Sequence, residues 1–113
     1  MRSSGRRVGQ LVFFMDETFV KAYDAIMKDK NIDCLESYLL CRYINKYERY
    51  GCVETSDSKD AEFLKIDRHY VSNKRMHLEN LGYIKSYAGK GKKTIIQISI
   101  DILNKVGIKI KQQ

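Results

Sequence analysis

The sequence predicts an α+β fold in which three helices form a core and a β-hairpin follows them, with an extra strand or helix at the N-terminus. Three observations indicate this fold. Apolar side chains recur at helical spacing between residues 17 and 81, and cap residues flank each such segment. Two β-type runs joined by glycines and lysines come next. The 113 residues, 43% of them hydrophobic, suffice for one buried core.

The N-terminal segment divides into an arm and a first helix. Residues 1–9 are rich in Ser, Gly and Arg without apolar periodicity, which is typical of a flexible basic arm. The apolar run 11–15 indicates a strand or extended lead-in. The folded domain is therefore expected at residues 10–107, with a tail at 108–113. Residues 17–28 predict a helix with one packing stripe formed by Phe19, Val20, Tyr23, Ile26 and Met27.

The longest expected helix runs from a cap at Asp33 to about residue 50, where Gly51 stops it. Its apolar side chains repeat at three and four residues, as a helix with one buried face requires. A symmetric contact between two copies of the chain can come from the lead-in at 11–15 or from the tyrosines of this helix, which are Tyr38, Tyr43, Tyr47 and Tyr50.

Two short helices around a tight turn follow a brief extended piece at 52–55. Ser56 or Asp57 caps the first of them, which ends near Leu64, and a turn at 65–66 comes next. This arrangement is a helix-turn-helix pattern.

The second short helix has clear signals at both ends. Asp67 is its expected cap, and it continues to Leu81. Gly82 closes it, because glycine adopts a left-handed backbone without steric cost. At about 100° per residue, Val71, Leu78 and Leu81 share the side that faces the core.

A β-hairpin is predicted by runs at 83–87 and 94–100, joined by a glycine- and lysine-rich tip at 88–93. The second run has two alternating faces. One is expected to pack and holds Thr94, Ile96, Ile98 and Ile100, and the other is more exposed to water and holds Ile95, Gln97 and Ser99. Residues 101–106 fit a last helical turn ended by Gly107, and the tail beyond it is either extended or frayed.

The net charge of +7 is distributed unevenly along the chain. Residues 8–64 hold eleven acidic and seven basic side chains, whereas residues 65–93 hold eight basic and two acidic ones. Such a concentration favours a directional contact with a polyanion over a generally basic surface, although a solvated basic face is the alternative. The eight basic residues are Lys65, Arg68, Lys74, Arg75, Lys85, Lys90, Lys92 and Lys93.

The cysteines indicate neither a disulfide framework nor a zinc site. Cys34, Cys41 and Cys52 are odd in number, and their spacings of six and ten residues match no paired metal motif. Buried or half-buried thiols are expected for Cys34 and Cys41. The sequence has no long apolar run and no apolar core of a secretory signal, so a cytoplasmic protein is expected.

Catalysis and cofactor binding are not expected. The two histidines, His69 and His77, lie on one expected helix without a nucleophile and an orienting acid. The carboxylates are scattered over the first half of the chain. Gly89 and Gly91 lack the spacing and the following helix of a nucleotide-binding loop. We therefore expect no enzyme activity, no metal, no cofactor and no small-molecule substrate.

The segment Leu78-Glu79-Asn80-Leu81-Gly82-Tyr83-Ile84 followed by a basic hairpin resembles the winged helix-turn-helix family over about residues 11–100. The resemblance is nearest to the winged-helix domains of plasmid and phage replication initiators and replisome organisers. The motif is also shared with transcriptional repressors and other DNA-binding proteins.

The resemblance implies that the helix at 67–81 enters the major groove of DNA and that the hairpin tip, the wing, lies on the backbone. The residues expected to read bases lie opposite the core side and are His69, Ser72, Asn73 and Met76. Those expected to contact the backbone are Lys65, Arg68, Lys74, Arg75, Lys90, Lys92 and Lys93. Lys74 or Arg75 occupies a position that is usually apolar in the family, so the rotation of the helix stays open.

The expected function is sequence-specific binding of double-stranded DNA, without membrane contact, as a monomer or a homodimer. The resemblance implies a role in replication, transfer or transcription of a plasmid, phage or other mobile element. A winged helix used as a protein-interaction adaptor is the alternative, and its mark would be an uncharged wing. The basic arm either enters a minor groove or is a disordered start.

Overall fold

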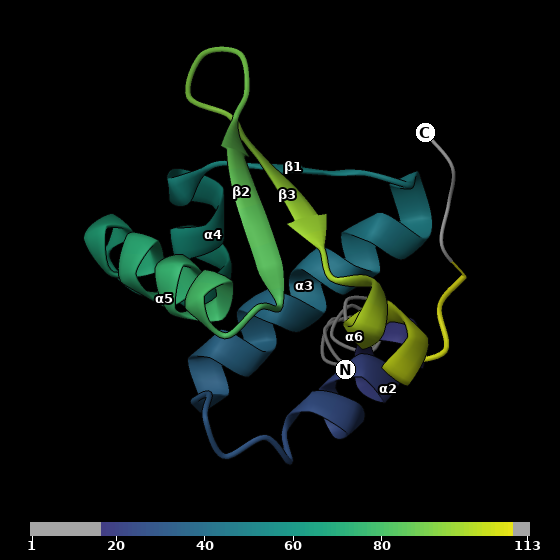
Figure 1. Cartoon of the computed structure of the whole chain (residues 1–113). Helices are drawn as coiled ribbons and strands as arrows, with labels where there is room; N and C mark the ends of the chain where they lie inside the picture. The colour runs from purple at the N-terminus through teal and green to yellow at the C-terminus, as the bar shows by residue number, and fades with distance from the viewer. Residues whose placement is uncertain (1–16, 110–113) are drawn as a thin grey trace, which may run out of the picture.

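The computed structural model describes residues 17–109, with side chains from Val20 onward. Within these described residues, five helices pack around a small three-stranded sheet, and the β2–β3 hairpin projects from the body of the molecule (Figure 1). The expected basic arm at 1–9 and the apolar run at 11–15 lie outside the described residues. The predicted α+β architecture, with an additional helix before the three-helix core, is confirmed.

The first described helix, α2 (Glu17–Ile26), packs against α3 through part of the predicted stripe, Tyr23 and Ile26, together with Ala22. Ala22 and Ile26 are buried, and Tyr23 is half-buried. Val20 and Met27 are 50% and 53% exposed, so their placement in the core was wrong. Alanine, with its single methyl group, lets two helices approach closely, and apolar periodicity alone does not reveal this.

The central helix α3 (Cys34–Tyr50) begins and ends where the sequence predicts. The Asp33 carboxylate accepts a 2.7 Å hydrogen bond from the Glu36 backbone N–H, and the Glu36 carboxylate accepts a 2.9 Å bond from the Asp33 N–H. This reciprocal capping box satisfies two N–H groups that the helix leaves free. Gly51 ends the helix with a left-handed backbone at φ 76°.

Two of the four tyrosines of α3 are buried. Tyr43 is fully buried and Tyr47 nearly so, because both belong to the hydrophobic core. Tyr38 is half-buried and stacks on Tyr23 with ring centroids 5.1 Å apart. Tyr50 alone among the four is exposed. Burial therefore excludes Tyr43 and Tyr47 from the predicted symmetric contact, which stays a prediction for Tyr38 and Tyr50.

The sheet consists of β1 (Val53–Thr55), β2 (Ile84–Ala88) and β3 (Thr94–Ile98), in the antiparallel order β1-β3-β2. Val53 pairs with Ile96, and Ile84 pairs with Ile98, so these four side chains lie on one inner face. The predicted alternation of β3 is confirmed at Ile96 and Ile98, while Ile95 and Gln97 face outward.

The C-terminal segment returns to the core through a short helix, α6 (Ile100–Lys105). Ile100 begins this helix and is 58% exposed, so its assignment to the packed face of the strand was wrong. Ile102 and Leu103 are buried, and Gly107 turns the chain with φ 77°. Ile108, the first residue of the expected tail, packs in the core.

The three thiols have different surroundings. Cys41 is buried, and burial raises its pKa to about 12. Cys34 and Cys52 are exposed, so the expectation of a buried Cys34 was wrong. Within residues 17–109 no three metal-ligating side chains form a group. None of the described helices combines the length and hydropathy needed to cross a membrane.

Candidate nucleic-acid interface

The turn between α4 (Asp57–Leu64) and α5 (Arg68–Asn80) gives the two helices their relative orientation. Ser56 caps α4 by accepting a hydrogen bond from the Lys59 backbone N–H. Lys65 ends α4 in a left-handed conformation at φ 59°. Asp67 occupies the cap position of α5, but its side chain makes no capping hydrogen bond. The predicted helix-turn-helix is present, and the capping role of the Asp67 side chain is wrong.

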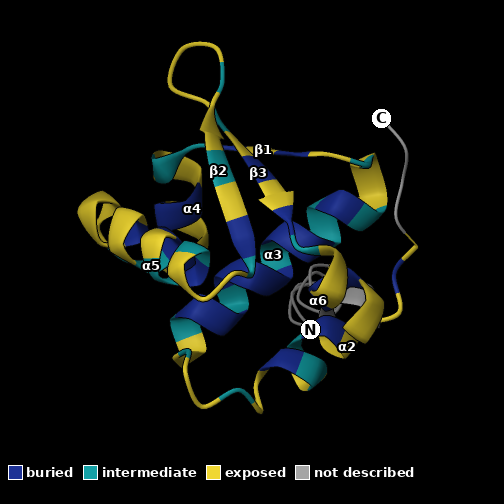
Figure 2. Ribbon diagram, viewed as in Figure 1, coloured by how far each residue is buried: buried dark blue, intermediate teal, exposed yellow. Residues whose placement is uncertain are grey.

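The two sides of α5 differ sharply in exposure (Figure 2). Val71 and Leu78 are fully buried against the core. Leu81, just beyond the helix, is 38% exposed, so its assignment to the core side was wrong. The four residues expected to read bases are all exposed, and their spacing places them on one outward strip: His69, Ser72, Asn73 and Met76.

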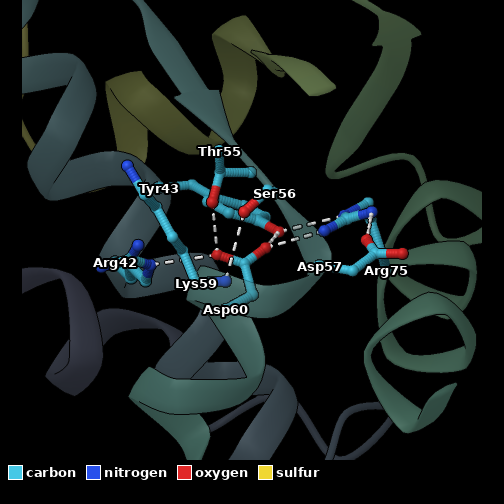
Figure 3. Close-up of polar contacts among 8 residues, drawn as sticks. All are labelled: Arg42, Tyr43, Thr55, Ser56, Asp57, Lys59, Asp60 and Arg75. Atoms are coloured by element: carbon cyan, nitrogen blue, oxygen red, sulfur yellow. Dashed lines mark hydrogen bonds and ion pairs between the residues drawn. The ribbon is translucent and has the colours of Figure 1, made fainter. Parts of the chain in front are cut away.

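Arg75 lies inside the protein, so it is not a backbone-contacting residue as expected from the sequence. It is 8% exposed, and its guanidinium donates to Asp60 at 2.8 Å and to Asp57 at 2.6 Å (Figure 3). The Nε atom also donates to the Tyr43 hydroxyl at 3.1 Å. Burial disfavours a charged guanidinium, but these partners offset it, and the pKa of Arg75 is raised.

Asp60 is the centre of this buried polar cluster (Figure 3). Its carboxylate is fully buried and accepts hydrogen bonds from the Tyr43 hydroxyl and the Thr55 hydroxyl, both at 2.6 Å. Arg42 donates to it at 3.1 Å, and Arg75 completes the set. The donors come from α3, β1 and α5, while Asp60 itself lies on α4. One carboxylate therefore fixes the four elements that position the outward strip of α5.

Sequence reasoning missed Asp60, Tyr43 and Thr55 as a cluster. A signal exists in the helical spacing, because Asp60 falls on the same inner side of α4 as Leu64. Arg75 likewise falls between Val71 and Leu78 on the inner side of α5. A carboxylate and a guanidinium at core positions of adjacent helices indicate a buried pair.

Lys74 and His77 tie α5 to the start of α3. The Lys74 ammonium lies 2.8 Å from the Asp33 carboxylate, and its side chain is only 20% exposed. Burial would raise the pKa of Asp33, but hydrogen bonds from Lys74 and from the helix backbone lower it overall. The His77 Nδ1 atom lies 2.7 Å from the Glu36 carboxylate. Lys74 is thus engaged within the protein, unlike the exposed Lys65 and Arg68.

The hairpin is joined firmly to α5. Gly82 has φ 85°, and the Tyr83 N–H donates to the Leu78 carbonyl at 3.0 Å, which is the hydrogen bond of a Schellman motif. The Glu79 carboxylate accepts a 2.6 Å bond from the Ser86 N–H of β2. These contacts fix the direction in which the hairpin leaves α5.

The tip of the hairpin presents three exposed lysines, Lys90, Lys92 and Lys93. The Gly89 N–H donates to the Lys93 carbonyl at 2.9 Å, and Gly91 turns the chain with φ 64°. The glycine in the left-handed region is required at this bend because a side chain there would be strained. The tip is therefore a compact, basic turn.

Comparison with known proteins shows the fold. The sequence matches no protein-family model and no curated protein sequence. The structure is similar to MepR, described as a transcription regulator of the Staphylococcus aureus multidrug efflux pump MepA. The TM-score is 0.54 and the sequence identity 16%, and the match covers 88% of this chain and 68% of MepR. The chain therefore has a winged-helix fold.

Proposed function

We propose that the protein binds double-stranded DNA, with α5 in the major groove and the wing on the phosphate backbone. The observation that carries this proposal is the exposed outward strip of α5, together with the basic tip of a hairpin whose strand β2 packs against α5. The side chains of this strip are polar apart from Met76, whereas Val71, Arg75 and Leu78 on the opposite side of α5 are buried. A helix in this position and a basic loop beside it are the two elements that winged-helix proteins apply to a duplex.

The outward strip has the chemistry needed to read base edges. Asn73 can make a bidentate pair with adenine, and Ser72 can hydrogen-bond several bases. Met76 is 54% exposed and can contact a thymine methyl group. His69 lies nearest the start of α5, where its ring is tilted against Tyr70 with centroids 4.1 Å apart. We infer sequence-specific recognition from this set.

Phosphate contacts come from the exposed basic residues around the strip. Lys65 and Arg68 lie beside the start of α5. Lys74 joins them only by leaving its ion pair with Asp33. Arg75 is excluded because it is buried. The remaining contacts belong to the wing, through Lys90, Lys92 and Lys93.

The likeness to a transcription regulator favours transcriptional control as the process, in the cytoplasm. Replication or transfer of a plasmid, phage or other mobile element is the alternative that the sequence motif suggests. A homodimer on DNA fits either process, because two copies of one recognition helix read an inverted repeat.

Replacing the three wing lysines tests the role of the wing. In the Lys90→Ala/Lys92→Ala/Lys93→Ala variant, the slope of log K against log salt concentration should fall by about 0.9 for each phosphate that these lysines neutralise. Affinity should drop for all duplexes alike, because backbone contacts carry no sequence information. Fluorescence anisotropy with a labelled duplex over a range of salt concentrations measures both quantities.

The matched control replaces three lysines away from the wing with alanine, Lys28, Lys105 and Lys109. It changes the net charge equally, so any general electrostatic effect appears in both variants. Equal salt slopes in the two variants would exclude the wing from the interface.

A further inference from the structure

A hollow of about 640 Å³ lies between the wing tip and the end of α3. Its walls come from the second half of α3, from β1, from the first turn of α4 and from the tip of the hairpin. In Figure 1, β1 runs across the upper part of the molecule from the end of α3 to the start of α4, and the hairpin rises past it. Five of the residues that line it are lysines, namely Lys46, Lys59, Lys90, Lys92 and Lys93.

The positive charge of this lysine hollow is poorly compensated. Glu54 is the one carboxylate among its described lining residues. Its only described ion pair is with Lys93, at 3.9 Å, and both side chains are more than half exposed. A pair of this length and exposure contributes little free energy. The other four lysines have no ion-pair partner within residues 17–109.

The ammonium group of Lys46 lies in surroundings that disfavour its positive charge. This side chain is half-buried on α3. Burial lowers the pKa of Lys46, and repulsion from Arg42 and Lys59 lowers it further, which together outweigh the attraction of the Asp60 carboxylate. Amino groups held together against their own repulsion are stabilised when an anion binds between them.

The lysine hollow adjoins the elements proposed to bind DNA. Two of its lining residues, Lys59 and Ser56, belong to α4 and its N-terminal cap. Helix α4 packs directly against α5. The opposite wall is the wing tip itself. A backbone strand that passes the wing after leaving the groove occupied by α5 comes within reach of both walls.

We infer that the lysine hollow receives phosphodiester groups of the DNA backbone flanking the groove that holds α5, with Lys46 and Lys59 as additional phosphate-binding residues. This inference rests on the proposed function. The hollow is larger than one phosphate group and open to solvent, which suits a length of backbone. The duplex footprint therefore extends past the wing toward α3.

The test measures the salt dependence of duplex binding by the Lys46→Gln/Lys59→Gln variant of the full chain. If each lysine neutralises one phosphate, the slope of log K against log salt should fall by about 1.8. The preferred base sequence should stay the same. The control is Lys28→Gln/Lys105→Gln, which removes the same charge from positions outside the hollow. Its slope should equal that of the unaltered protein.

Lys46 is half-buried, so its replacement can disturb the fold. Two further variants test the inference without removing its charge. Lys59→Gln alone changes an exposed side chain and should lower the slope by about 0.9. Lys46→Arg retains the charge and should keep the slope of the unaltered protein when Lys59 is native.

The outcomes separate this inference from the proposed function. If the wing variant lowers the slope and the Lys46/Lys59 variants do not, the inference is overturned and duplex binding by α5 and the wing stands. If the unaltered protein binds no duplex, both are overturned. Binding of pyrophosphate that is abolished in the double variant, with no change in the duplex slope, would overturn the assignment to DNA backbone in favour of a free anion.

Discussion

The Asp60→Ala variant should lose about 3–5 kcal/mol of unfolding free energy, the cost of removing one partner from a buried ion pair. The carboxylate is fully buried and accepts four hydrogen bonds, from Arg42, Tyr43, Thr55 and Arg75. Without it, the guanidinium of Arg75 stays buried with Asp57 as its remaining acidic partner. Urea denaturation followed by circular dichroism measures the loss.

Two matched variants identify the cause of that loss. Asp67→Ala removes an exposed carboxylate with no capping hydrogen bond, so its effect should stay within about 0.5 kcal/mol. Asp60→Asn keeps the shape but supplies one acceptor oxygen and two N–H donors, which face the donors of Arg42 and Arg75. It should therefore also be strongly destabilising. A loss below about 1 kcal/mol in Asp60→Ala would contradict the role of this carboxylate in fixing α5.

The Asn73→Ala variant should relax the preference for one base pair by about 1–3 kcal/mol, the discrimination that a bidentate side chain contributes. Asn73 is exposed on the outward strip of α5, so its removal leaves the core unchanged. Preference at the other positions of the site should persist, because His69, Ser72 and Met76 remain. Competition binding with duplexes that differ at single positions measures the change.

Asn104→Ala is the control for this variant. Asn104 is exposed on α6, outside α5 and the wing, and its replacement should leave the base preference unchanged. A uniform loss of affinity for every duplex in Asn73→Ala would mean that the side chain contacts the backbone. No change at all would mean that α5 does not read bases through Asn73.

Local signals in the sequence predicted the helix ends well. Asp33, Gly51 and Gly82 act within one turn of their own position, through a cap hydrogen bond or a left-handed backbone. Their roles are therefore readable without knowledge of the tertiary structure. The alternation of β3 at Ile96 and Ile98 was readable for the same reason.

Charged residues with tertiary partners were not readable in this way. From the sequence, Arg75 is expected to contact phosphate because it is basic and lies on α5. In the structure it forms an ion pair with Asp60, fifteen residues earlier. Lys74 likewise pairs with Asp33, forty-one residues away. Only the fold brings these groups together, so charge along the sequence overestimates the basic surface of α5.

The rotation of a helix is also set by its neighbours. The stripe predicted for α2 includes Val20 and Met27, which are exposed, and omits Ala22, which is fully buried. Hydrophobicity ranks the larger side chains first, whereas close packing of α2 on α3 selects the smallest one. The outward strip of α5 was placed on the exposed side because Val71 and Leu78 fix the opposite side.

Selection from a random duplex library at physiological salt tests sequence-specific DNA binding most directly. We expect the retained duplexes to share one enriched motif, arranged as an inverted repeat if the protein binds as a homodimer. Retention without an enriched motif would contradict base reading by α5. No retention would contradict DNA binding itself and would favour a winged helix that binds another protein.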